Sequence, residues 1–471
     1  MVIQLLILIL LVLVVSFLFV SPKTGTWILI FSCIFQTGYF LRWTIIELSR
    51  FWAWLPFLVA GILLLPLIMK EALQDNFLLH KRTPVQRLFL FVFILSSAGI
   101  ISCLVNGISI ATGIFGLRYY FIIVLMTSIF FDFKVLNLNF DNYLRFFVWV
   151  GIIQIPFTVL QRVLFSYAGV TLNVDSSDLI CGTYSAYSTL AFMQFLALGI
   201  VICYWFRFER PILGKSVMLL NTLLFTPLLL SNSRASFLFF VIFLCLLAVR
   251  HIKKLMRRMA SYTIPSILML IIMFSGIVFG FGHLQKQDYN RDLKNEYAFD
   301  HMLEYISRPS SDSFEQFYFK NKDPRMGRLA AIITSYELIT QDILKAFLGL
   351  GPGNTQKSDV LKQNGQYYQS FGVLSGLGRN QLSLTLSELG LLGLLLFILL
   401  FFWLLNCINS IKKFNILKHE ILLDVYIIIV FLIFIFSIYS RILTDYAIIL
   451  CVSFFIATLQ HEYLVANKII D

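Results

Sequence analysis

The chain has 471 residues, of which 59% are hydrophobic and only 13% are charged. A composition this apolar leaves too little polar surface to cover a water-soluble globule, so soluble folds are excluded. The net charge of +12 would suit a nucleic-acid-binding protein. However, the basic residues fall in short loops between apolar runs, which is typical of a membrane protein, and no nucleic-acid partner is expected.

Apolar runs of about 20 residues recur along the chain, and each is long enough to cross a bilayer as a helix. They predict an all-α, polytopic membrane protein with about 12–14 transmembrane helices. The expected spans are 3–20, 26–41, 52–69, 88–105, 112–131, 144–165, 187–206, 216–231, 234–250, 263–281, 386–407, 422–438 and 444–460.

The basic loops predict the orientation and the domain organisation. Loops 70–87, 207–215, 250–258 and 412–418 carry the Lys and Arg residues and fall on one side, which we expect to be cytoplasmic. The long insertion falls on the other side. The chain therefore divides into an N-terminal transmembrane bundle (1–281), a large outer loop with an amphipathic helix (282–385) and C-terminal transmembrane helices (386–471).

The outer loop contains one strong helix signal. Asp323 and Pro324 form a helix start, and apolar residues then recur at helical spacing from Leu329 to Phe347. Gly349 ends the pattern, so we expect a single amphipathic helix of about 24 residues. A glycine turn over 349–354 follows this helix, and the pair Arg379-Asn380 precedes the next span.

Several arginines are predicted at the outer membrane level. Each buried arginine costs a few kcal/mol and needs a partner or a ligand, and the guanidinium fork suits phosphate oxygens. The spans and their ends carry Arg118, Arg162, Arg234 and Arg441, and the loop carries Arg325, Arg328 and Arg379. Together they predict an outward-facing anion site. Structural alternatives stay open, because Arg441 can pair with Asp445, Arg162 can anchor a helix end, and Arg325 and Arg328 can simply face water.

Metal and nucleotide chemistry are not expected. The cysteines form no CxxC pair, the histidines form no HExxH pair, and no Asp-x-Asp pair is present to hold a nucleotide sugar through a metal. The glycine turn is not a dinucleotide fingerprint, because no strand precedes it. We therefore expect no metal-held nucleotide sugar and no metal or other cofactor.

These features together resemble the O-antigen ligase and polymerase superfamily, the Wzy/WaaL-type bacterial membrane glycosyltransferases. The resemblance covers roughly residues 110–410. Its segments are Leu117-Arg118-Tyr119, Ser233-Arg234-Ala235, Gly327-Arg328, the turn from Gly349 to Asn354, and Asn380 leading to Glu388-Leu389-Gly390-Leu391-Leu392-Gly393.

The resemblance implies a GT-C-like fold, a polyprenyl-diphosphate-linked glycan as donor, and a multi-pass protein of the bacterial inner (cytoplasmic) membrane. It also implies membrane lipid, a flippase and a chain-length regulator as partners. We assign catalytic roles to Arg234, Arg328, Arg379 and Glu388, with Glu388 as a guess for the general base. We assign substrate binding to Arg118, Arg162, Arg325, Gly351, Gly353, Asn354, Asn380 and Arg441.

One departure from the family pattern favours a polymerase over a ligase. Ligases usually carry His-Asn where this chain has Arg379-Asn380, and a protonated arginine cannot accept a proton. A ligase, a transporter of lipid-linked glycans and a non-catalytic assembly partner remain the alternatives.

Overall fold

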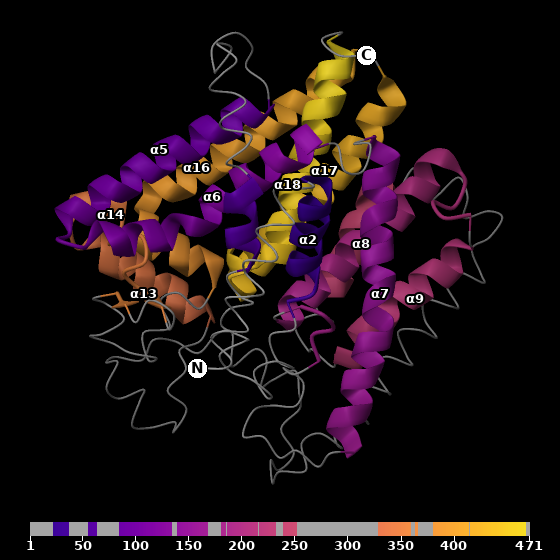
Figure 1. Cartoon of the computed structure of the whole chain (residues 1–471), viewed down its shortest axis with the longest axis horizontal. Helices are drawn as coiled ribbons and strands as arrows, with labels where there is room; N and C mark the ends of the chain where they lie inside the picture. Colours follow the sequence, from indigo (N-terminus) through magenta and orange to yellow (C-terminus); the bar gives the residue numbers. More distant parts are fainter. Residues whose placement is uncertain are drawn as a thin grey trace. The chain divides into compact units, whose positions relative to one another are not determined.

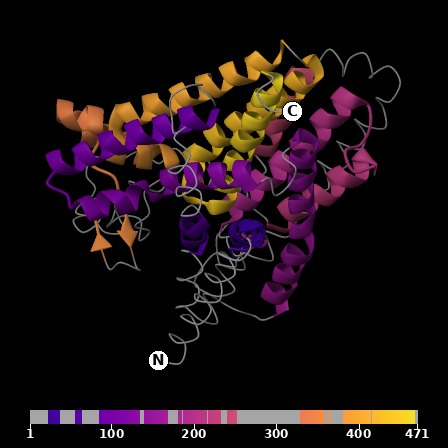
Figure 2. The ribbon, with the colours of Figure 1, turned by 45° about the horizontal axis from the view of Figure 1, so that its top comes forward.

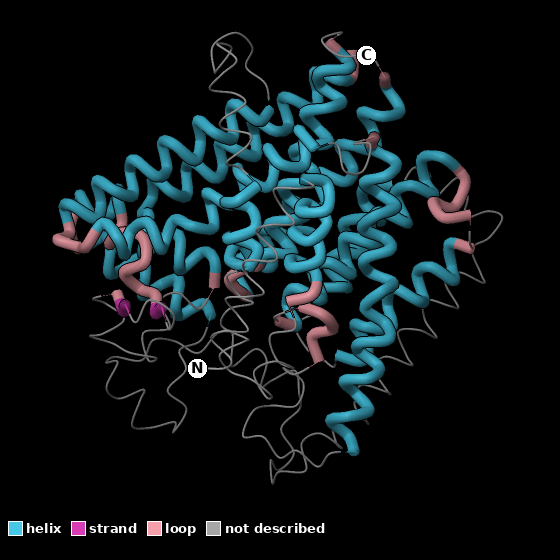
Figure 3. Tube along the Cα trace, viewed as in Figure 1, coloured by secondary structure: helices cyan, strands magenta, loops and turns pink. Residues whose placement is uncertain are grey.

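The computed structural model describes a subset of the chain, and nearly all of it is helical (Figure 3). The described residues are 22–36, 55–63, 84–133, 139–167, 180–184, 186–214, 216–231, 239–251, 328–358, 363–365, 380–413 and 415–467. The spans predicted at 3–20 and 263–281 lie outside these residues, and so does the first part of the predicted loop, 282–327.

Seven of the described helices are long and apolar enough to cross a membrane. They are α5 (Pro84–Val105), α6 (Ile110–Phe133), α7 (Phe140–Tyr167), α8 (Tyr187–Phe208), α16 (Gln381–Ile411), α17 (Ile416–Tyr439) and α18 (Tyr446–Ala466). Each corresponds to a predicted span, which confirms an all-α, polytopic membrane protein. The predicted spans at 26–41, 216–231 and 234–250 appear in the described residues as shorter helices: α2 (Pro22–Ile34), α9 (Val217–Ser231) and a helix over 239–251.

The chain forms two compact units, and the first comprises residues 1–143, 301–423 and 433–471. In this unit α5, α6, α16 and α18 pack against one another, and α5 and α16 lie side by side in both ribbon views (Figures 1 and 2). Aromatic rings fill the contact between α6 and α18, where the centroids of Phe130 and Phe454 are 5.0 Å apart. These helices form the frame that carries the loop segment described below.

The second unit comprises residues 144–300 and 424–432. Helix α8 is buried along most of its length and serves as the core of the unit. Phe195 of α8 stacks on Phe243, with ring centroids 5.5 Å apart. Two buried glutamine side chains of α7 hold the polar turn that precedes α8. Gln161 donates to the Gly182 carbonyl (2.6 Å), and Gln154 accepts from the Thr183 amide (2.9 Å).

The single long loop helix was a wrong prediction, because the chain breaks at residues 341–342. Two helices are present, α13 (Arg328–Thr340) and α14 (Ile343–Leu348). Asp342 is extended (φ −143°) and caps α14, since its side chain accepts from the Leu344 amide. The apolar spacing continues across the break, which is why periodicity alone missed it. The predicted helix start at Asp323 and Pro324 lies outside the described residues.

The first C-terminal span begins earlier than predicted, at Gln381 and not at 386. Asn380 caps α16 in a capping box with Ser383. A non-helical residue, Gly390 (φ 63°), then divides α16 into a buried first segment over 381–389 and a longer second segment. A hairpin of two antiparallel two-residue strands, β1 (Lys357–Ser358) and β2 (Gln363–Asn364), precedes α16 and was not predicted.

Candidate functional site

The glycine turn after α14 lies on the first segment of α16. The Leu350 amide donates to the Ser387 carbonyl (2.7 Å), and the Gly351 amide donates to the Glu388 carbonyl (3.2 Å). Gly349, Gly351 and Gly353 have φ values of 72°, 95° and 79°, a region that residues with side chains rarely adopt. Glycine at alternate positions therefore gives the turn its path.

The turn also approaches α5 and α6 closely. The Ser102 hydroxyl of α5 donates to the Gly349 carbonyl (3.1 Å). A Cβ added to Gly116 of α6 would lie 2.2 Å from the Gly353 nitrogen, and one added to Gly353 would lie 2.3 Å from the Thr112 carbonyl oxygen. Three membrane helices thus enclose the turn, and backbone touches backbone at Gly116.

This close approach predicts a strong effect of Gly116→Ala. The added methyl must displace the Gly353 backbone, and overpacking of this kind costs about 1–3 kcal/mol. Thermal unfolding of the detergent-solubilised protein should show a clear fall in melting temperature. Gly61→Ala is the matched control, because a Cβ there meets nothing within 4 Å and alanine is the better helix former. Equal melting temperatures for the two variants would contradict the packing described here.

Glu388 supplies the carboxylate around which the turn closes. Its side chain is buried, with 4% exposure. Oε2 accepts from the Gly353 amide (2.9 Å) and from Gln356 Nε2 (2.9 Å). Oε1 accepts from the Thr355 amide (3.2 Å) and the Thr355 hydroxyl (2.7 Å). The turn is therefore an anion-binding concavity, and the anion that it holds is a carboxylate of the same chain.

These bonds bear on four residues that the sequence pointed to. The amides of Gly351 and Gly353 donate to Glu388, and the Asn354 side chain donates to the Leu350 carbonyl (2.9 Å). Substrate binding by the three turn residues and general-base action by Glu388 stay predictions. The hydrogen bonds give all four a structural function in the turn.

Arg328 opens α13 and lies over an aromatic ring. Its guanidinium carbon is 3.6 Å from the ring centroid of Tyr439, at the end of α17. The Arg328 carbonyl accepts from Asn380 Nδ2 (2.8 Å), while Asn380 Oδ1 accepts from the Ser383 amide (2.8 Å). Asn380 therefore ties the first residue of α13 to the beginning of α16, which fixes the guanidinium over its ring.

Arg118 is held in a comparable way in the middle of α6. Its guanidinium carbon is 3.7 Å from the ring centroid of Phe115 and 4.0 Å from that of Tyr119. It also donates to the Phe115 carbonyl oxygen (2.5 Å) and to the Tyr119 hydroxyl (2.5 Å). The Tyr119 ring in turn lies 5.9 Å from the ring of Tyr446, the first residue of α18.

One short stretch, the 439–446 segment, connects the surroundings of three arginines. Tyr439 lies under Arg328, Tyr446 lies beside the Tyr119 ring next to Arg118, and the exposed Arg441 lies between them in the sequence. Gln381 at the start of α16 holds this segment, because its amide donates to the Ser440 carbonyl (3.0 Å) and its side chain accepts from the Leu443 amide (3.1 Å). The structure thus arranges Arg118, Arg328 and Arg441 around one segment of the first unit.

The remaining predicted arginines are placed elsewhere or are not described. Arg162 lies on α7, in the second unit, and is half-buried. Arg234, Arg325 and Arg379 lie outside the described residues. Asp445, the acid considered as a partner of Arg441, caps α18 by accepting from the Ala447 amide (2.9 Å).

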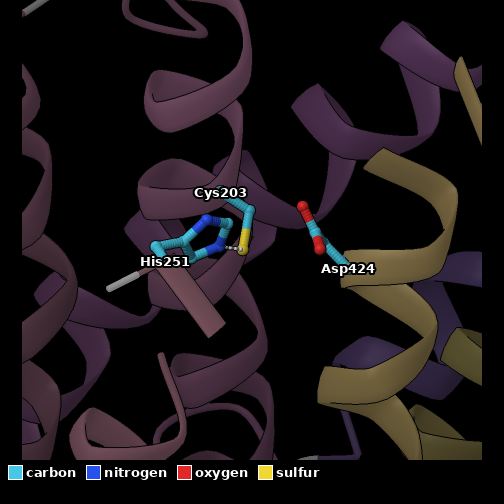
Figure 4. A group of neighbouring side chains, drawn as sticks. All are labelled: Cys203, His251 and Asp424. Atoms are coloured by element: carbon cyan, nitrogen blue, oxygen red, sulfur yellow. Dashed lines mark hydrogen bonds between the residues drawn. The ribbon is translucent and has the colours of Figure 1, made fainter. Parts of the chain in front are cut away.

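The second unit contains a buried group with the spacing of metal ligands. The ligand atoms of Cys203, His251 and Asp424 all lie within 4.8 Å of one another, and Cys203 Sγ is 3.4 Å from His251 Nε2 (Figure 4). Asp424, however, accepts from Arg207 Nε (2.6 Å) and Nη2 (3.1 Å) and from Arg250 Nε (2.8 Å). Two guanidinium charges on one carboxylate repel a divalent cation, so this donor set fits an ion-pair network.

The same group does not have the geometry of a catalytic triad. Figure 4 shows Cys203 between His251 and Asp424, whereas the acid of a triad bonds to the imidazole and orients it. Asp424 instead joins α8 and the 239–251 helix to α17 through its two arginines.

Asp424→Asn is therefore expected to destabilise the second unit. The change leaves Arg207 and Arg250 near a neutral amide, and removing one partner of a buried ion pair costs about 3 kcal/mol or more. Chemical or thermal unfolding of the purified protein measures the effect. Asp342→Asn is the control, because asparagine caps a helix about as well as aspartate. A melting temperature that does not change in Asp424→Asn would contradict the network.

Several residues of the turn and of the surroundings of the arginines were not predicted from the sequence. Thr355 and Gln356 follow the glycine turn directly, and Glu388 is a charged residue within an apolar span. These two features were the available signals for the pairing of Thr355 and Gln356 with Glu388. Tyr439 and Gln381 had no comparable signal, because their contacts join helices that are far apart in the sequence.

Comparison with known proteins identifies one family. Residues 219–398 match the family model described as O-antigen ligase (Wzy_C). The matched range includes α13, α14, the glycine turn, Asn380 and Glu388. No curated protein matches the chain. The match confirms the resemblance inferred from the sequence, and the family implies an enzyme of the glycosyltransferase or ligase type that acts on a lipid-linked glycan in a membrane.

Proposed function

Because residues 219–398 match the O-antigen ligase family model, we propose that this chain polymerises polyprenyl-diphosphate-linked oligosaccharide repeat units. The product is a surface polysaccharide, namely O-antigen, capsule or exopolysaccharide. The reaction takes place at the outer face of the bacterial inner membrane and uses no metal ion. A flippase delivers the substrate, and a chain-length regulator acts on the product.

The proposed reaction transfers a glycan from one lipid carrier to the end of another glycan. A hydroxyl of the acceptor sugar attacks the anomeric carbon of the donor, a new glycosidic bond forms, and the bond from that carbon to the diphosphate oxygen breaks. The hydroxyl proton passes to a base, and the diphosphate leaves with the bonding electrons. Fixed positive charges near the leaving oxygen are the largest electrostatic contribution available without a metal.

The observation that carries the proposal is the arrangement of Arg118, Arg328 and Arg441 around the 439–446 segment. Arg328 and Arg118 present the faces of their guanidinium groups to aromatic rings. Stacking uses the face of the group, and the N–H edge is the part that binds phosphate. At Arg118, two of the five N–H donors are bonded to the Phe115 carbonyl and the Tyr119 hydroxyl. We assign stabilisation of the diphosphate to Arg328 and Arg118, and the sequence adds Arg234 and Arg379 as further candidates.

The polymerase assignment rests on the residue before Asn380. Arg379 cannot accept a proton, so the His-Asn pair of the ligases is replaced by a pair whose first residue cannot act as a base. Glycan analysis of a deletion strain tests the assignment. We expect lipid-linked or lipid-A-linked glycan that stops at a single repeat unit, and complementation should restore the long chains.

A ligase is the second candidate, because the matching family model is described as O-antigen ligase. Loss of a ligase leaves long polymer on the polyprenyl carrier that is not transferred to its acceptor. Finding long unattached polymer in the deletion strain would therefore overturn the polymerase assignment in favour of the ligase.

A further inference from the structure

We propose that Glu388 is a positioning residue, which locks the loop segment 328–356 onto α16, and that it is not the general base of the reaction. The effect of this lock on turnover rests on the proposed function. The lock itself is a structural claim, and its test does not require an active enzyme.

The first step concerns the lone pairs of the carboxylate. An ionised carboxylate offers about four acceptor positions on its two oxygens. Four donors from Gly353, Thr355 and Gln356 lie 2.7–3.2 Å from these oxygens, two on each. A general base needs an acceptor position within hydrogen-bond reach of the proton that it removes. The four described bonds occupy the acceptor positions of Glu388, so the carboxylate has no position left for the proton of a substrate hydroxyl.

The second step concerns what the bonds connect. The segment 328–356 is tied to α16 at both of its ends: at Arg328 through Asn380, and at Gly353–Gln356 through Glu388. Asn380 and Glu388 are eight residues apart on one helix, which corresponds to about 12 Å along its axis. Two ties separated by that length fix the direction of the segment as well as its position.

The third step concerns the packing between the two ties. Ile339 of α13, Leu350 of the turn and Leu386 of α16 form a buried apolar cluster. A Cβ on Gly349 would lie 2.5 Å from the Glu388 carbonyl carbon and 2.6 Å from the Gly390 nitrogen. The turn therefore fits α16 at the point where α16 bends. The side-chain bonds of Glu388 hold the turn in this place, and the turn is joined through α14 to α13, which begins with Arg328.

Hydrogen exchange and kinetics of Glu388→Gln test the proposal. The amide of glutamine donates where the carboxylate accepts, so a bond from at least one backbone amide, that of Gly353 or that of Thr355, is lost. We expect exchange of the backbone amides over 351–356 to rise about tenfold or more, because a hydrogen bond to a charged group is removed. With a polyprenyl-diphosphate-linked repeat unit as substrate, KM should rise together with a fall in kcat, since Arg328 loses its fixed position.

Three further variants complete the experiment. Thr355→Val removes one donor to Glu388 and keeps the shape of the side chain, so it should give a smaller rise in exchange. It replaces Glu388→Gln as the test variant if Glu388→Gln does not fold. The exchanged pair Glu388→Gln with Gln356→Glu should recover part of the protection. Glu462→Gln is the matched control, because Glu462 is a buried glutamate of the same unit that pairs with Lys418 and should leave exchange in the turn unchanged.

The outcomes separate the two claims. Unchanged exchange over 351–356 in Glu388→Gln, or in Thr355→Val where the first variant does not fold, overturns the positioning role. Unchanged exchange together with a loss of kcat at constant KM would return Glu388 to the role of general base. Raised exchange in a protein whose wild type forms no glycosidic bond supports the lock and rejects the proposed function alone.

Discussion

Arg328→Ala is expected to reduce polymer formation about 100- to 1000-fold, the loss typical of removing one group that stabilises charge in a transition state. The residue is tied by its backbone to Asn380 and stacked by its guanidinium on Tyr439, so it is fixed before substrate binds. Removing the side chain leaves the tie through the carbonyl in place. We therefore expect the fold of the protein and its abundance in the membrane to change little.

The measurement is the length and yield of polymer in a deletion strain that carries each variant at matched expression. Lys345→Ala is the control, since Lys345 is a cation on α14 of the same loop segment and should not matter for the leaving group. Arg328→Lys keeps the charge but not the planar fork, and should recover only part of the activity. Wild-type polymer in Arg328→Ala would remove Arg328 from the site.

Arg118→Ala is expected to reduce polymer formation about 10- to 100-fold, and Arg118→Lys should restore little of it. The guanidinium group of Arg118 is set by its contacts with Phe115 and Tyr119. A lysine ammonium carries the same charge but cannot keep the stacked, planar contact. The loss in the lysine variant therefore measures geometry, and the difference between the alanine and lysine variants measures charge.

The double variant Arg118→Ala with Arg328→Ala tests whether the two arginines serve one leaving group. Groups that act on the same charge are not additive in their effects on rate. We expect the double variant to lose less activity than the product of the two single losses. An exact product would indicate that the two residues act on separate steps, which contradicts a shared role around the 439–446 segment.

The membrane helices could be predicted from sequence because the bilayer imposes one simple requirement. A run of about 20 apolar residues must form a helix to satisfy its backbone in lipid, and α5, α6, α7, α8, α16, α17 and α18 all follow from that rule. The bounds were less predictable where polar residues take part in the fold. Polar residues at 381–385 place this part of α16 outside the apolar run of the sequence, yet Gln381, Ser383, Leu384 and Thr385 are buried.

The loop segment shows the limit of periodicity more clearly. The apolar spacing from Leu329 to Phe347 has one phase, but Asp342 satisfies the Leu344 amide locally and ends the first helix. The glycine turn was found from its composition, whereas its partner was not. Nothing in the sequence shows that the anion held by these glycines is Glu388, about 35 residues further along the chain, because that contact depends on tertiary packing.

The candidate site was predictable in its chemistry and less so in its placement. The high free-energy cost of arginine in a membrane singled out Arg118 and Arg441, and the resemblance to the O-antigen ligase and polymerase superfamily singled out Arg328. The aromatic rings that hold Arg118 and Arg328 could not be assigned, because aromatic residues make up 16% of the chain and nothing in the sequence distinguishes these rings from the others.

The most direct test is the reconstitution of purified protein in liposomes with a polyprenyl-diphosphate-linked single repeat unit and no added metal. We predict that the wild-type protein forms new glycosidic bonds, visible as a ladder of products that differ by one repeat unit, and that Arg328→Ala forms almost none. Movement of the lipid-linked unit between leaflets with an unchanged glycan, or an equal ladder from Arg328→Ala, would contradict the account.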